Sequence, residues 1–224
     1  MKNLLFVLAC LLSFSLFGQG ACNNQSSITH QGYEYAIVEI GDQCWFSENC
    51  RYLPEVSLSS ERSETEPHYY VYRFAGSTVS EAKATTNYES YGVMYNWPAV
   101  MTEGVCPTGW HIPSDGEFTE LTDFLGGQTV AGGKMKEAGY DHWSSPNTDA
   151  TNSSGFTCLP GGYATSDGPA GRGEVGFFWS TSESDYDSDG DMDTWFLMMT
   201  SDSRTIFTEY GTQDCASSAR CVRD

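Results

Sequence analysis

The sequence predicts a single domain of the α+β class, with short mixed or antiparallel sheets, one main helix over about residues 114–125 and long loops. Three observations support this prediction. The clearest helix-start signal lies near the middle of the chain, runs typical of strands lie on both sides of it, and no internal repeat or linker divides the 224 residues. A chain of this length is large enough to bury a substantial core in one domain.

Residues 1–20 have the pattern of a secretory signal peptide. A lysine near the start is followed by an apolar run to Phe17 and by the small residues Gly18 and Gly20. We therefore expect export of a mature domain over residues 21–224, in which no run of ~20 apolar residues could cross a membrane. Lipid anchoring through Cys22 is the less favoured alternative, because Gln19 stands where such signals usually have an aliphatic residue.

A β-hairpin is predicted at the start of the mature domain. Residues 33–40 alternate between apolar and polar side chains, Gly41-Asp42 supplies a turn, and residues 44–46 return as the second strand. Residues 53–67 are rich in Ser and Glu without periodicity, so we expect a surface loop there.

Aromatic segments follow this loop. Residues 69–74 alternate again and are expected to form a strand. A polar stretch through Asn87 then leads to residues 91–97, which we expect in the core.

The main helix is predicted by a capping box. Ser114 is followed three residues later by Glu117, so the serine oxygen can accept from the amide of Glu117 while the glutamate accepts from the amide of Ser114. Apolar residues then recur at the spacing of one helical face: Phe118, Leu121 and Leu125. Gly126-Gly127 ends the helix, and residues 110–113 before it are expected to form a short strand.

Strands dominate the predicted second half of the chain. A short helical turn is expected at residues 132–138, and a polar loop around Trp143 at residues 142–154. The later strands are expected at residues 155–160, 177–180, 195–200, 205–210 and 219–223.

Six motifs occur in an order that resembles a known family. They are IGDQCWFSEN (40–49), YGVMYNW (91–97), GVCPTGWHIPSDGEF (104–118), NSSGFTCLPGGY (152–163), FFWSTSE (177–183) and ARCVRD (219–224). Together they resemble the Fibrobacter succinogenes major paralogous domain, a bacterial extracellular module. The resemblance implies a fold of the C-type-lectin-like group, which also contains the formylglycine-generating enzymes. It implies no particular activity, since most members of the family have none defined.

Seven of the eight cysteines lie in the mature domain, where disulfides are the default after export. The resemblance implies a bridge between Cys106 and Cys221. Two further pairs are expected: Cys158 with Cys215, and Cys22 with Cys44. Cys50 stands where relatives usually have leucine and is the expected free thiol. The alternative pairs Cys44 with Cys50 and leaves Cys22 for a lipid.

The acidic segment at residues 185–193, DYDSDGDMD, is a candidate calcium site. It places carboxylates at alternate positions around Gly190: Asp185, Asp187, Asp189, Asp191 and Asp193. The match to a calcium loop stops at its twelfth position, where Phe196 replaces the bidentate glutamate. A solvated acidic hairpin is the alternative.

The charge balance excludes two classes of partner. Lys and Arg number 11 against 30 Asp and Glu, for a net charge of -19. Nucleic acids and anionic membrane surfaces require clustered basic residues, so we expect neither to bind. The acidity predicts solubility and weak self-association.

No catalytic constellation is expected. The four histidines, His30, His68, His111 and His142, are isolated and lack the spacing of a zinc site. His111 lies beside Trp110 and is expected to be structural. The reactive cysteines of the formylglycine-generating enzymes have no counterpart, and a degenerate enzyme with a reactive Cys50 is kept as an alternative.

A binding role is therefore predicted. Four aromatic residues on or beside expected loops are the candidate ligand contacts, unless they belong to the core: Trp143, Tyr163, Trp179 and Trp195. We expect a secreted or cell-surface, non-catalytic binding or adhesion module whose ligand is a carbohydrate or a protein. A structural surface component without a small ligand is the other alternative.

Overall fold

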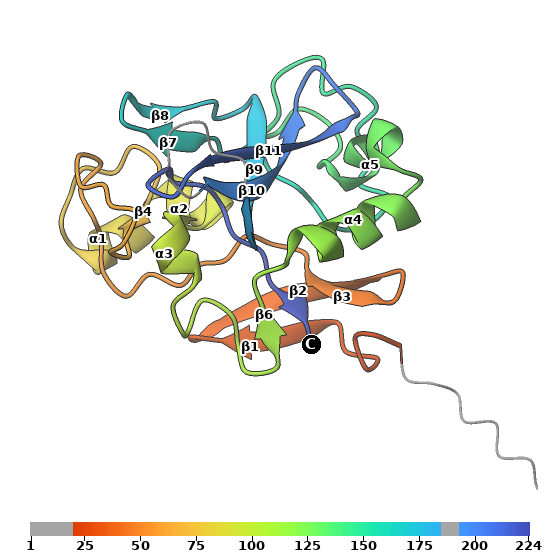
Figure 1. Cartoon of the computed structure of the whole chain (residues 1–224), viewed down its shortest axis with the longest axis horizontal. Coiled ribbons are helices and arrows are strands. Elements are labelled where there is room, and N and C mark those ends of the chain that lie inside the picture. The colour runs from red at the N-terminus through yellow and green to blue at the C-terminus, as the bar shows by residue number, and fades with distance from the viewer. Residues whose placement is uncertain (1–19, 185–192) are drawn as a thin grey trace, which may run out of the picture.

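A five-stranded antiparallel sheet gathers strands from both ends of the described chain, which in this computed structural model comprises residues 20–184 and 193–224. Its strands are β1 (Ser27–His30), β2 (Tyr33–Ile40), β3 (Gln43–Phe46), β12 (Val222–Arg223) and β6 (Trp110–His111), in that spatial order. Val222 lies opposite Trp45 on one side and His111 on the other. The last strand is therefore inserted between segments from the first half of the chain (Figure 1).

A second antiparallel sheet lies above the first in Figure 1. It consists of β9 (Val175–Ser184), β10 (Asp193–Thr200) and β11 (Ile206–Thr212), with β10 in the centre. Two further sheets have two antiparallel strands each: β4 (Tyr69–Tyr70) with β5 (Met94–Tyr95), and β7 (Tyr163–Thr165) with β8 (Gly168–Ala170).

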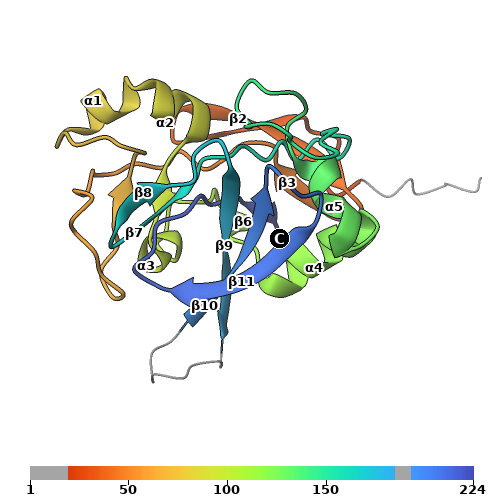
Figure 2. The same cartoon turned by 90° about the horizontal axis from the view of Figure 1, so that it is seen from above.

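Helices lie at both sides of this layered structure, as Figure 2 shows from above. The longer pair is α4 (Asp115–Phe124) and α5 (Gln128–Met135), joined by Gly126 and Gly127, both with positive φ. The shorter helices are α1 (Val79–Lys83), α2 (Thr86–Tyr91) and α3 (Trp97–Val100). Each short helix begins at a side-chain cap, from Thr78, Thr85 and Asn96 respectively.

Strand β3 connects two hydrophobic cores. All four of its residues are buried, because Cys44 and Phe46 pack into one cluster while Trp45 packs into the other. The cluster around Trp45 contains Phe118 and Leu121 of α4, so the helix covers that face of the sheet. Apolar burial on both faces thus fixes the sheet relative to its neighbours.

The structure confirms the predicted α+β class, the β2–β3 hairpin and the capped helix. Ser114 is the N-cap of α4, and the reciprocal hydrogen bonds of the capping box are both present. The strands predicted around 177–180, 195–200 and 205–210 correspond to β9, β10 and β11, which extend further.

Five predicted elements were wrong, too long or displaced. The strand expected at 110–113 ends after His111, and the helical turn expected at 132–138 is part of α5, which begins at Gln128 and ends at Met135. Residues 155–160 form no strand beyond an isolated bridge at Cys158, because Gly155 and Thr157 have positive φ and interrupt an extended chain. The strand expected at 69–74 ends after Tyr70, and the last strand is only β12. Helices α1 to α3 were missed, although Thr78 followed by Glu81 is itself a capping signal.

The predicted signal peptide, except for its last residue Gly20, and most of the acidic segment lie outside the described residues. In the part of the chain that is described, no helix has both the length and the apolar composition needed to cross a membrane.

Candidate functional site

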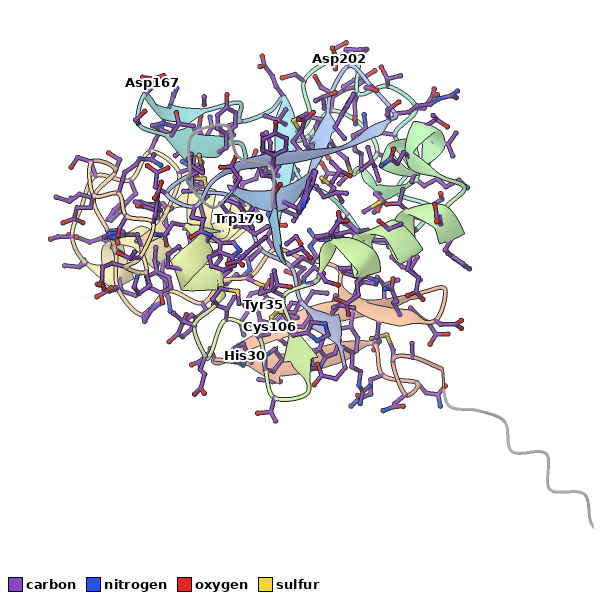
Figure 3. The ribbon with its side chains drawn as sticks, viewed as in Figure 1. His30, Tyr35, Cys106, Asp167, Trp179 and Asp202 are labelled. Atoms are coloured by element: carbon purple, nitrogen blue, oxygen red, sulfur yellow. A yellow bond between two sulfur atoms is a disulfide. The ribbon has the colours of Figure 1, made fainter. Side chains whose placement is uncertain are left out.

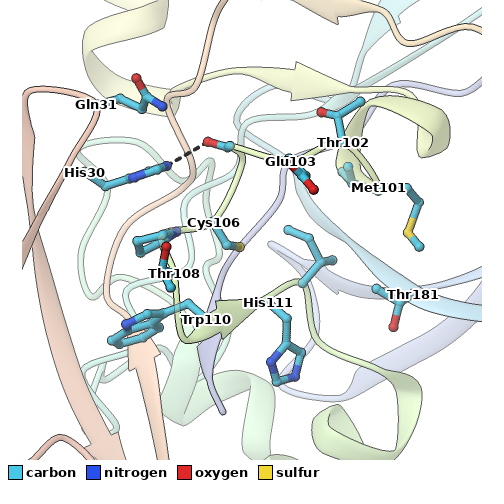
Figure 4. Close-up of a pocket in the computed structure, with 14 residues that line it drawn as sticks. His30, Gln31, Met101, Thr102, Glu103, Cys106, Thr108, Trp110, His111 and Thr181 are labelled. Atoms are coloured by element: carbon cyan, nitrogen blue, oxygen red, sulfur yellow. Dashed lines mark hydrogen bonds between the residues drawn. The ribbon is translucent and has the colours of Figure 1, made fainter.

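A cavity of about 720 Å³, which we call the first cleft, opens beside the five-stranded sheet. Three parts of the chain line it: the turn after β1, the segment 100–112, and Thr181 of β9. Imidazole, carboxylate and hydroxyl groups meet there with the apolar side chains of Met101 and Trp110. Figure 4 shows these side chains arranged around the opening. A concave surface with a few convergent polar groups is typical of ligand sites.

The loop that forms one wall of the first cleft is fixed at two points. Cys106 is joined to Cys221 by a disulfide, which ties the loop to the end of the chain. Nε2 of His30 lies 2.7 Å from the carbonyl oxygen of Gly104, the contact drawn in Figure 4. Gly104 has a φ of 100°, a conformation that favours glycine. The wall is therefore held in place before any ligand arrives.

His111 lies on the floor of this cleft between two carboxylates. Its Nδ1 is 2.5 Å from Oδ1 of Asp224, and its Nε2 is 2.7 Å from Oε1 of Glu117. Both ring nitrogens must donate to satisfy two carboxylates, which requires the imidazolium form. Burial alone would lower the pKa of His111, but the hydrogen bonds and charges of the two carboxylates outweigh it and raise the pKa.

Glu117 couples the cleft to helix α4. Its other oxygen, Oε2, accepts 2.8 Å hydrogen bonds from the backbone N–H and the hydroxyl of Ser114. Burial would raise the pKa of Glu117, but these bonds and His111 lower it overall. The carboxylate is therefore ionised at neutral pH and holds the His111 ring in position.

The charges around the first cleft favour a neutral or cationic ligand. Glu103 is exposed on its rim, and Glu117 and Asp224 flank the single imidazolium of His111. Three carboxylates against one imidazolium leave negative charge next to the opening, which disfavours an anionic ligand.

A second cleft of about 250 Å³ shares His30 and Gln31 with the first. Its lining includes four tyrosines and two cationic side chains: Tyr33, Tyr35, Tyr52, Tyr88, Arg51 and Lys83. The guanidinium carbon of Arg51 lies 4.5 Å from the centre of the Tyr33 ring. Concave surfaces of different chemistry therefore flank the turn between β1 and β2.

Two of the four predicted ligand-binding aromatics belong to the core instead. Trp143 is 1% exposed and its indole N–H donates to the carbonyl of Cys158 at 2.9 Å. Trp179 is fully buried and donates to the carbonyl of Tyr95 at 2.6 Å. Figure 3 places Trp179 in the interior of the molecule. Because each polar N–H has a buried partner, both rings are satisfied without a ligand.

The other two predicted aromatics lie away from the clefts. Trp195 is half-buried and packs edge-to-face on Tyr210, with 5.6 Å between ring centres. Tyr163 packs in the same way on Phe177, at 5.0 Å. Neither is among the residues that line the first or second cleft. The structure thus does not bring the four predicted aromatics together as one site.

The cysteine pairing differs from the expectation in one bridge. Cys22–Cys44 and Cys106–Cys221 are joined, so Cys44 is not available to Cys50 as the alternative required. Cys158 and Cys215 are free thiols instead of a pair. Cys158 is buried in the hydrophobic cluster around Trp45, which also contains Trp143. Cys215 packs against the other cluster, which contains Phe46. Cys50 is also a free thiol, and it is buried.

The candidate calcium segment is largely outside the described residues. Asp185, Asp187, Asp189 and Asp191 all fall in the part that is not described. Asp193 begins β10, where it lies opposite Ser184 on one side and Thr212 on the other. The calcium hypothesis therefore stays a prediction from sequence.

The residues that form the clefts were not predicted as a site. His111 was noticed but assigned a structural role, and His30 and Glu103 carry no local signal. The cysteine pair was the available signal, because a bridge from Cys106 to Cys221 brings the 100–112 segment beside the end of the chain.

Comparison with known proteins identifies the family. The family model described as the Fibrobacter succinogenes major domain matches residues 38–223, and the chain belongs to this family. A search of curated proteins and a search of solved structures each found no match.

Proposed function

We propose that this member of the Fibrobacter succinogenes major domain family is a non-catalytic binding module that holds a neutral or amino-substituted saccharide across the first and second clefts. The observation that carries this proposal is the pair of adjoining clefts around the turn at His30 and Gln31. Binding modules of the C-type-lectin-like group would place a ligand on such loops, and we propose that fold group for this chain.

The lining chemistry supports a saccharide. Sugar hydroxyls accept and donate hydrogen bonds, which suits the carboxylate of Glu103, the hydroxyl of Thr181 and the ring of His30. Sugar C–H faces pack on aromatic rings, and the second cleft supplies half-buried tyrosines such as Tyr33 and Tyr52.

Export to the cell surface or the medium is part of this proposal. The support is the apolar N-terminal segment, together with two disulfides of the kind that persist in oxidising compartments.

A glycan array probed with the mature domain, residues 21–224, tests the saccharide proposal. Binding should be weakened at least tenfold in Glu103→Gln and unchanged in Glu209→Gln, an exposed matched substitution on β11 outside both clefts. Selective capture of peptides instead would support the alternative of a protein ligand. Binding of neither would leave a structural surface component, and turnover of a bound glycan would contradict the non-catalytic assignment.

Calcium remains a proposed accessory ligand of residues 185–193, on the sequence alone. Calcium added after a chelator has removed bound metal should raise the melting temperature of the protein. The double substitution Asp187→Asn with Asp189→Asn should abolish this rise. The control replaces two aspartates that Figure 3 shows at the surface, Asp167→Asn with Asp202→Asn. An unchanged melt would make the segment a solvated hairpin.

A further inference from the structure

We propose that Cys106 is a releasable thiol of the first cleft, because Cys50 can replace it as the disulfide partner of Cys221. The Sγ atoms of Cys50 and Cys221 are 3.4 Å apart, and Cys221 is bonded to Cys106. All three sulfur atoms lie within 4.8 Å of one another. A free thiol in contact with a disulfide is the arrangement from which thiol–disulfide exchange proceeds.

Backbone hydrogen bonds already hold Cys50 beside the C-terminal segment that contains Cys221. The backbone N–H of Cys50 donates to the carbonyl of Ala219 at 2.9 Å, and that of Phe46 donates to the carbonyl of Cys221 at 3.0 Å. These bonds align the two segments on either side of the sulfur contact. A bridge between Cys50 and Cys221 therefore joins two segments that the main chain already holds together, once their side chains have rotated.

Exposure distinguishes the two possible partners of Cys221. Cys50 and Cys221 are fully buried, whereas Cys106 is half-buried and lines the first cleft. Figures 3 and 4 show Cys106 close to His30 at this opening. Exchange would protect the new disulfide in the core and leave the Cys106 thiol facing the cleft. Its reaction partners would be small disulfides and small thiol-reactive electrophiles.

The exchange balances without an external oxidant or reductant. The Cys50 thiolate attacks Sγ of Cys221, the Cys50–Cys221 bond forms, and the Cys221–Cys106 bond breaks. Cys106 leaves as a thiolate and takes up one proton, which replaces the one that Cys50 lost. Attack requires the three sulfur atoms to lie in one line, but they are too close together for that arrangement. The cysteine side chains must therefore rotate before the attack. Uncatalysed rearrangements of this kind take minutes to hours.

The environment of Cys50 sets the pH dependence of the exchange. Burial raises the pKa of Cys50 to about 12, although the Arg220 guanidinium acts in the opposite direction. The phenols of Tyr35 and Tyr95 also face it and are protonated at neutral pH, since burial raises the pKa of each. The attacking thiolate is therefore scarce, and exchange should accelerate as the pH rises.

The test is a timed alkylation of the native mature protein with N-ethylmaleimide at pH 7 and pH 8.5. After acid quenching and digestion without reduction, mass spectrometry should find the label on Cys106 and a peptide linked through Cys50 and Cys221. Both products should grow together and faster at the higher pH. Cys215, a half-buried free thiol, reports in the same sample that the reagent is active.

Two variants make the test decisive. In Cys50→Ala, Cys106 should stay bonded to Cys221 and unlabelled while Cys215 still reacts. In Cys106→Ala, Cys50 and Cys221 should form the new disulfide during oxidative refolding. The proposal is overturned if Cys106 labels equally in Cys50→Ala, if only the Cys106–Cys221 peptide is ever found, or if both thiols stay reduced in Cys106→Ala. None of these readouts depends on saccharide binding.

Discussion

Arg220 is a charged residue enclosed in the core. It is fully buried, and no carboxylate of the described residues hydrogen-bonds to it. Its guanidinium donates to the carbonyl of Phe156 and, at 2.6 Å, to Oδ1 of Asn49. The same group lies 4.2 Å and 5.0 Å from the ring centres of Phe156 and Phe178. Desolvation lowers the pKa of Arg220 to about 10, yet the side chain stays charged at neutral pH.

We predict that Arg220→Lys destabilises the protein although it conserves the charge. A lysine ammonium cannot reproduce the planar fork or stack on two rings, so several acceptors lose their donor. The expected loss is about 3 kcal/mol, or about 6–12 °C in melting temperature. The control is Arg204→Lys, whose side chain is 53% exposed beside Asp149 and which should change stability by less than about 0.5 kcal/mol. Equal melting temperatures for the two variants would contradict this role.

His111 should titrate above its ordinary value of about 6.5. Because its pKa is raised, the contacts with Asp224 and Glu117 contribute stability that is fully present below the unfolded-state value of about 6.5, as long as both carboxylates are ionised. This stability is lost as the pH rises through the folded-state pKa. NMR titration of the imidazole measures the pKa directly. Asp224→Asn should bring it down, and an unshifted imidazole in the wild type would rule out the imidazolium assignment.

At the level of the element, local signals were enough to predict the β2–β3 hairpin, the α4 helix and the strands of the second sheet. Each of these depends on residues close together in sequence, such as Ser114 and Glu117 in the capping box. The loop around Trp143 was harder, because its polar neighbours suggested exposure. That ring is buried among residues distant in sequence, with Nζ of Lys136 5.3 Å from its centre and its indole N–H donating to the carbonyl of Cys158.

Ser114→Ala should weaken α4 at its first turn. The substitution removes the hydroxyl that accepts from the amide of Glu117 and donates to the Glu117 carboxylate. The expected cost is about 1 kcal/mol, seen as a loss of about 2–4 °C in thermal unfolding. Thr119→Ala, at an exposed position of the same helix, should leave the melting temperature unchanged or slightly higher. A destabilisation of the same size in both variants would show that the cap is not the cause.

At the scale of the whole molecule, the clefts depend on contacts between the C-terminal strand and the first half of the chain, which no local sequence pattern encodes. The bridge between Cys106 and Cys221 spans 115 residues, and β12 pairs with β3 and β6. Asp224 reaches His111 only because of these contacts. The sequence predicted the bridge through family resemblance, but not which side chains it would bring together.

The charge of the whole molecule leads to the last prediction. With a net charge of -19, the folded chain repels itself, and the repulsion is long-ranged at low salt because the Debye length is about 30 Å at 0.01 M. Raising the sodium chloride concentration from 0.01 to 0.15 M shortens the Debye length to about 8 Å and weakens the repulsion. We expect the melting temperature to rise by a few degrees, because each kcal/mol of added stability corresponds to about 2–4 °C. Calorimetry in the presence of a chelator excludes calcium binding as the cause, and chloride avoids the general stabilisation that sulfate produces. A melting temperature that falls or stays constant would mean that ion pairs such as Arg204–Asp149 contribute more than the net repulsion.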